Sequence, residues 1–181
     1  MSRLADAQAL LDGAELICDA AQVDATVARL AREITAALGD SYPLLLSVMG
    51  GAVVFTGNLL PQLAFPLDFD YLHVTRYGGD TQGGALRWIS EPRIPVAGRT
   101  VLVLDDILDE GITLAAIRRH LLDAGAQRCL TAVFSDKMIG RTKPIKADFT
   151  GLELPDRYVF GYGMDVRGAW RNLPAIYALR E

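Results

Sequence analysis

The residues best suited to chemistry form a short acidic cluster directly after an apolar run. Residues 100–104 read Thr-Val-Leu-Val-Leu, and Asp105, Asp106 and Asp109 follow within five positions. Adjacent carboxylates can bind sugar hydroxyls or hold a divalent cation, partly through water. Because clustered carboxylates repel one another, three of them in so short a segment indicate a ligand that offsets the repulsion.

The residues that follow this cluster have the composition of a phosphate-binding turn. Glu110, Gly111, Ile112 and Thr113 lead into a helical pattern that begins at Leu114. Backbone N–H groups at the start of a helix point towards an anion, and glycine lets the chain fold closely around it. The alternative is that the acidic residues are only turn residues and helix caps, which suits one Asp better than three.

Apolar strands and amphipathic helices alternate along the chain and would position this turn. Strands are expected at residues 44–49, 67–74, 100–104, 130–134 and 158–160. Helices are expected at residues 23–34 with a stop at Gly39, from Gly51 through Leu60, and at residues 114–121 with a C-cap at Gly125. This alternation predicts an α/β fold with a parallel sheet flanked by helices. Ligands bind such folds beyond the carboxyl ends of the strands, where the turns after Met49, Leu104 and Phe134 are expected.

A glycine-rich segment interrupts this pattern. Residues 75–90 contain four glycines among polar residues. The composition is typical of a mobile loop or long hairpin, which we interpret as a flap that closes over a site.

Composition argues against several other classes of protein. The 181 residues suit one domain with a sizeable core. The net charge of −4 and the pI of about 5.2 are unsuited to nucleic-acid binding. Cys18 and Cys129 give no disulfide framework, so a reducing compartment is expected. His73 and His120 are not clustered with other ligands, so no zinc site is expected.

One uncharged stretch, residues 41–67, is long enough to cross a bilayer. Glycines and prolines break it, so it is better interpreted as a buried strand, a turn and a short helix. The N-terminus carries no apolar signal-peptide segment. We therefore expect a cytoplasmic protein without membrane association.

The acidic turn resembles the phosphoribosyl pyrophosphate motif of type I phosphoribosyltransferases. Other segments narrow the resemblance to the hypoxanthine-guanine branch, over residues 46–175. They are Met49-Gly50-Gly51, Tyr77, Lys137, residues 148–151, 155–159 and 161–165, and Arg171. The resemblance implies one domain over residues 1–181, with a parallel sheet, a mobile flap and a small hood. It also implies an N-terminal helical segment over residues 1–38 and a C-terminal base-binding part over residues 150–181.

The resemblance assigns one group of residues to phosphoribosyl pyrophosphate. It implies that Asp105 and Asp106 hold the ribose hydroxyls and the attached Mg²⁺, and that Asp165 binds a second Mg²⁺. The 5′-phosphate would be cradled by Glu110, Gly111, Ile112 and Thr113. Gly50, Gly51 and Arg171 would contact the pyrophosphate, and Tyr77 would cover it from the flap.

A second group of residues would recognise the purine. By the same resemblance, Asp109 acts as general base near N7, Lys137 donates to O6, Tyr158 stacks on the ring, and the backbone of Val159 contacts its edge. An ammonium group can only donate, so Lys137 suits a 6-oxopurine better than the amino group of adenine. Taken singly, these residues also suit ordinary surface, turn or core positions.

The implied activity is Mg²⁺-dependent phosphoribosyl transfer to hypoxanthine or guanine, giving IMP or GMP and pyrophosphate, in a homodimer or homotetramer. One alternative keeps the fold as a nucleotide-sensing regulator without catalysis. Another is a signalling receiver domain, which also carries an acidic pair and a lysine. The receiver does not account for the glycine-rich flap or for residues 158–165.

Three positions depart from the family pattern. Met49 and Glu110 stand where the family usually has a cation and a hydroxyl residue, and Arg76 replaces the flap serine. A carboxylate at position 110 should repel a phosphate unless the side chain points away. Our hypothesis is that Arg76 replaces the cation lost at Met49. Arg76→Ser should then raise the inhibition constant of pyrophosphate strongly, and an unchanged constant would exclude it.

Overall fold

The computed structural model describes residues 2–76 and 86–180. Its helical elements are α1 (Arg3–Asp12), α2 (Ala20–Leu38), α3 (Val53–Leu59), the 3₁₀ helix η1 (Leu60–Gln62) and α4 (Ile112–Asp123). Its strands are β1 (Ala14–Cys18), β2 (Leu44–Met49), β3 (Asp68–Arg76), β4 (Leu86–Ser90), β5 (Thr100–Leu108), β6 (Arg128–Met138), β7 (Phe149–Pro155), β8 (Val159–Phe160) and β9 (Ile176–Leu179).

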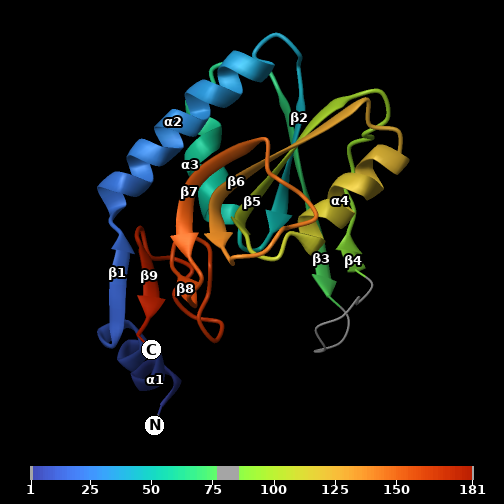
Figure 1. Cartoon of the computed structure of the whole chain (residues 1–181). Coiled ribbons are helices and arrows are strands. Elements are labelled where there is room, and N and C mark those ends of the chain that lie inside the picture. The colour runs from blue at the N-terminus through green and yellow to red at the C-terminus, as the bar shows by residue number, and fades with distance from the viewer. Residues whose placement is uncertain (1, 77–85, 181) are drawn as a thin grey trace.

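A six-stranded sheet in the order β4-β3-β2-β5-β6-β7 forms the centre of the fold. All neighbouring strands are parallel except β3 and β4, which form the antiparallel arms on either side of residues 77–85. Helices α2 and α3 cover one face and α4 covers the other (Figure 1). The expected α/β fold is therefore confirmed.

The sheet has a separate apolar core on each face. Side chains alternate along the central strands, so that Leu102 and Leu104 pack with α2 and α3 while Val101 and Val103 pack with α4. Helix α2 begins with a capping box between Asp19 and Gln22. Its buried stripe runs from Val23 to Leu38 and includes the stripe over residues 23–34 that the sequence predicts.

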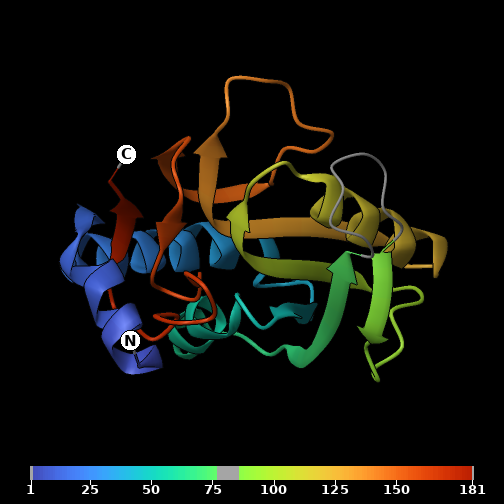
Figure 2. The same ribbon diagram turned by 90° about the horizontal axis from the view of Figure 1, so that it is seen from below.

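A smaller antiparallel sheet in the order β1-β9-β8 lies beside the carboxyl ends of the main sheet (Figures 1 and 2). We call this sheet, with residues 161–175, the hood. It corrects two expectations from the sequence. The N-terminal segment was expected to be helical but contains β1, and the predicted strand at residues 158–160 is shorter and pairs with β9 instead of joining the main sheet.

Among the described residues, no helix combines the length and the apolar character needed to cross a bilayer. The uncharged stretch at residues 41–67 instead folds into β2, α3 and η1.

Candidate active site

Asp105 and Asp106 lie on a strand and not in a turn, which corrects the expected end of the strand at Leu104. Strand β5 continues to Leu108 because its pairing with β6 continues, with Leu108 opposite Asp136. Strand β6 likewise continues past Phe134 to Met138, so Lys137 also lies on a strand. Because acidic residues are rare in strands, the sequence pattern predicts ends for β5 and β6 that are too early.

The two adjacent carboxylates share a partly buried position. Asp105 Oδ1 accepts a hydrogen bond from the N–H of Asp106 at 3.0 Å, and Asp106 Oδ1 accepts one from the N–H of Ile107 at 2.8 Å. Burial, and then the charge of Asp106, raise the pKa of Asp105 well above its usual range. Burial also raises the pKa of Asp106. A cation or hydroxyl donors at this position would stabilise both charges.

The Gly50-Gly51 turn approaches these carboxylates very closely. A Cβ atom on Gly51 would lie 2.0 Å from Asp106 Oδ2, which no side chain could tolerate without a shift. The Met49–Gly50 peptide bond is cis. On the other side of the turn, a Cβ atom on Gly163 would lie 2.1 Å from the carbonyl oxygen of Gly51. The turn is thus held tightly between β5 and the hood.

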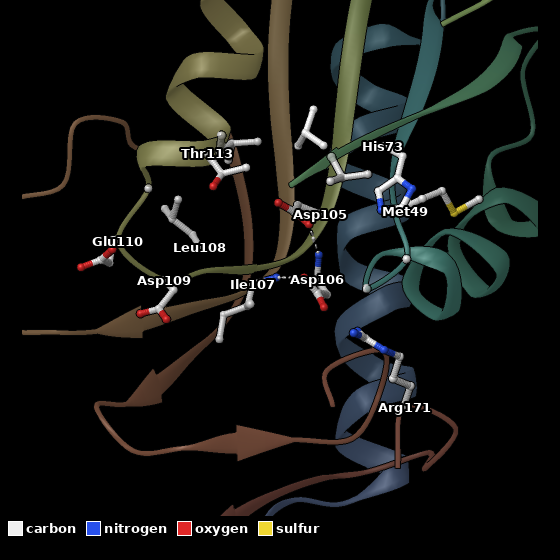
Figure 3. Close-up of a pocket in the computed structure, with 16 residues that line it drawn as sticks. Met49, His73, Asp105, Asp106, Ile107, Leu108, Asp109, Glu110, Thr113 and Arg171 are labelled. Carbon is white, nitrogen blue, oxygen red and sulfur yellow. Dashed lines mark hydrogen bonds between the residues drawn. The ribbon is translucent and has the colours of Figure 1, made fainter. Parts of the chain in front are cut away.

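The expected phosphate turn has the geometry that anion binding needs. Gly111 adopts a positive φ of 79° and caps α4, and Gly111 and Thr113 line the same cavity as Asp105. The carboxylate of Glu110 forms an ion pair with Arg141 and is directed out of the turn, away from Thr113 (Figure 3). Since that carboxylate is held outside by a cation, it does not conflict with a phosphate at the helix N-terminus.

Two adjoining cavities meet at the acidic cluster. The first has a volume of about 380 Å³ and lies between the Gly50-Gly51 turn, β5 and the start of α4. The second, of about 230 Å³, lies between β5, β6 and the hood. Asp106, Ile107, Asp109 and Arg171 line both cavities. A ligand with a sugar at the acidic cluster could therefore extend into either cavity.

The second cavity brings together the residues expected to bind a base. Lys137 Nζ lies 3.4 Å from Asp109 Oδ2, with 15% of the lysine side chain exposed. Tyr158 is exposed and its hydroxyl donates to the carbonyl oxygen of Asp165 at 3.3 Å. Val159 is buried in the cavity wall. A flat ring could enter here between a hydrogen-bonding edge and apolar side chains.

Asp165 and Arg171 are paired with each other. Arg171 Nη2 lies 2.5 Å from Asp165 Oδ1, and Arg171 Nη1 donates to the carbonyl oxygen of Gly163 at 2.6 Å. The N–H of Gly168 donates to Asp165 Oδ2 at 2.7 Å. These contacts hold Arg171 over both cavities from the hood.

Some expected residues cannot be placed, and others were missed. Tyr77, together with most of the predicted flap, lies outside the described residues. The side chain of Arg76 does too, so the hypothesis about Arg76 stays a prediction.

His73 was not expected in a site but lines the first cavity beside Met49 (Figure 3). The register of β2 and β3 places His73 opposite Met49, and no local sequence pattern sets that register.

Known proteins are similar to this chain in sequence and in fold. Residues 15–167 match the model of the phosphoribosyl transferase domain, and the chain belongs to that family. The hypoxanthine-guanine phosphoribosyltransferase of Bacillus subtilis is 34% identical over 160 residues, which cover 88% of this chain and 89% of the relative. The enzyme of the same name from Aquifex aeolicus is 32% identical over 86% of this chain and 88% of its own length. The crystal structure of a hypoxanthine phosphoribosyltransferase from Staphylococcus aureus matches with a TM-score of 0.89 and 25% identity, covering 95% of both chains.

Proposed function

We propose that this chain is a purine-salvage enzyme that transfers the 5-phosphoribosyl group from phosphoribosyl pyrophosphate to hypoxanthine or guanine. The products are IMP or GMP and pyrophosphate. The observation that carries the proposal is the pairing of Asp109 with Lys137 in a cavity that adjoins both the Asp105–Asp106 carboxylates and the N-terminus of α4. The names of the relatives support the same activity.

The phosphoribosyl group would span the junction of the two cavities. Its 5′-phosphate would accept hydrogen bonds from the N–H groups of Gly111, Ile112 and Thr113. Its ribose hydroxyls would donate to Asp105 and Asp106. The Gly50-Gly51 backbone and Arg171 would bind the pyrophosphate on the far side of the acidic cluster, with Tyr77 closing over it.

The purine would occupy the second cavity. Lys137 would donate to O6, and Tyr158 and the backbone of Val159 would hold the ring and its edge. A purine protonated at N7 presents the lone pair of N9 to C1 of the ribose. As the C1–O bond to pyrophosphate breaks and the N9–C1 bond forms, Asp109 accepts the N7 proton. Before that transfer, Lys137, which is paired with Asp109 at 3.4 Å in the structure, would be shared between the Asp109 carboxylate and O6.

The residues present fit Mg²⁺ of the kind that phosphate substrates bring with them. The described residues include no group of three or more His, Cys, Asp or Glu side chains that could hold a metal ion. Mg²⁺ commonly uses only one or two carboxylates and takes its other ligands from phosphates and water, which matches Asp105 and Asp106. Asp165 would contribute at a second ion. When bound, Mg²⁺ would neutralise the departing pyrophosphate.

Membership of the phosphoribosyl transferase family excludes the receiver-domain alternative. No observation favours a regulator without catalysis. We also propose that the protein works in the cytoplasm as one domain, assembles as a homodimer or homotetramer, and binds neither nucleic acid nor membranes.

The experiment combines the protein, phosphoribosyl pyrophosphate and Mg²⁺ with hypoxanthine, guanine, xanthine or adenine, and follows nucleotide formation. Turnover with hypoxanthine or guanine and none with adenine is expected. Binding of phosphoribosyl pyrophosphate without turnover of any base would instead support the regulator.

A further inference from the structure

Lys143 joins the end of β5, directly before Asp109, to β6, which carries Lys137. It lies in the loop of residues 139–148, between β6 and β7. Its ammonium group donates to the carbonyl oxygen of Leu108 at 2.6 Å, to the carbonyl oxygen of Lys137 at 2.7 Å and to Asp136 Oδ1 at 2.5 Å. An ammonium group has three protons, so these contacts use all of its donors.

The environment of Lys143 is unusual for a lysine. Only 11% of its side chain is exposed, whereas lysines are rarely buried unless they are paired. Lys143 is not among the described residues that line either cavity of the site. Its ammonium group therefore binds two backbone carbonyl groups and the carboxylate of Asp136, and not a substrate.

The three contacts fall where β5 and β6 separate. The pairing of the two strands ends at Leu108 and Asp136, after which the chain enters the phosphate turn on one side and β6 runs on beside β7. The carbonyl oxygen of Lys137 also accepts a hydrogen bond from the N–H of Ile139 at 3.0 Å. Lys143 adds a charged donor to a carbonyl group of both strands at once.

The three contacts of Lys143 lie directly beside Asp109 and Lys137, the proposed base-binding pair. Leu108 immediately precedes Asp109, and the second carbonyl belongs to Lys137 itself. Lys143 Cβ also lies next to the phosphate turn, since a Cβ atom placed on Gly111 would lie 3.4 Å from it. The side chain of Lys143 is thus adjacent to both the base side and the phosphate side of the site, by different atoms.

We infer that Lys143 is a positioning residue, which sets the spacing of Asp109 and Lys137 for a 6-oxopurine through the backbone carbonyls of Leu108 and Lys137. This inference rests on the proposed function. Two parts of the side chain are distinguished: the ammonium group binds the carbonyl groups on the base side, and the aliphatic stem lies next to Gly111 of the phosphate turn.

The test uses Lys143→Met, which keeps the stem and removes the ammonium group. The kcat/KM for hypoxanthine should fall by about 100-fold, since a misplacement of ~1 Å in a reacting group has that effect. The dissociation constant of phosphoribosyl pyrophosphate, measured by calorimetry without a purine, should stay at the wild-type value. Lys143→Arg, which keeps a charged donor, should recover part of the loss. Lys146→Met, an exposed lysine of the same loop, is the matched control and should change neither quantity.

Two results would overturn the inference. One is an unchanged kcat/KM for hypoxanthine in Lys143→Met. The other is a loss of thermal stability with hypoxanthine and phosphoribosyl pyrophosphate weakened equally, which would mark a purely structural residue. A wild-type protein that binds phosphoribosyl pyrophosphate but forms no nucleotide would overturn the proposed function itself, before any variant is compared.

Discussion

Gly51→Ala should reduce the activity of this protein without unfolding it. The added methyl group would lie 2.0 Å from Asp106 Oδ2 and 2.5 Å from Asp106 Cγ. Ordinary contact begins at 3.4 Å, so the carboxylate would have to move by about 1.4 Å. Gly51 is only partly buried and no positive φ is needed there, so the fold itself should tolerate the methyl group.

A shift of that size at a group that holds the ribose should reduce kcat/KM for phosphoribosyl pyrophosphate by roughly 100-fold, by the usual cost of ~1 Å misplacement. The assay is initial-rate formation of IMP at varied phosphoribosyl pyrophosphate, with thermal unfolding measured in parallel. Gly57→Ala is the matched control, because a Cβ atom there meets nothing within 4 Å and the residue lies within α3. Wild-type kinetics in a folded Gly51→Ala protein would refute the role of the close approach between this turn and Asp106.

Three further predictions follow from the site. Asp109→Asn cannot accept the purine proton, so kcat should fall about 100-fold or more while phosphoribosyl pyrophosphate binds as before; a near-normal kcat would exclude Asp109 as the base. Burial and the charge of Asp106 raise the pKa of Asp105 above its unfolded value, so above about pH 3.9 the folded protein keeps a proton that the unfolded chain has lost, and the free energy of unfolding should decrease as pH rises. Asp105→Asn should flatten that decrease in urea unfolding across pH, and an unchanged slope would contradict the assignment. Arg141→Met should release Glu110 beside the phosphate turn and raise the KM for phosphoribosyl pyrophosphate about fivefold, from roughly 1 kcal/mol of repulsion. Adding Glu110→Gln should restore that KM, and a double variant no better than Arg141→Met would show that the charge of Glu110 is irrelevant.

The sequence predicts the central part of this fold because its signals are local. The apolar stripe of α2 and the apolar run of β2 are both found where they were expected. Strand β1 was missed because its partner, β9, lies far along the chain, and only that pairing makes residues 14–18 a strand. The ends of β5 and β6 were missed because sheet pairing overrides the low strand propensity of their acidic residues.

In the candidate site, as in the fold, local sequence signals predict some features, and only the tertiary structure determines the others. The spacing from Asp105 to Thr113 predicts the acidic pair and the phosphate turn, which the structure places on one cavity. The ion pair of Glu110 with Arg141 and the contacts of Lys143 could not be predicted, because the loop of residues 139–148 has no periodic pattern. Those contacts depend on where the loop folds back, which only the tertiary structure determines.

A crystal structure of the protein with IMP bound would be the most direct test of the proposed function. We expect O6 of the base within hydrogen-bonding distance of Lys137 Nζ, N7 facing Asp109, and the 5′-phosphate at the N-terminus of α4. A nucleotide bound with its base away from Lys137, or with its phosphate outside the turn of residues 110–113, would contradict it.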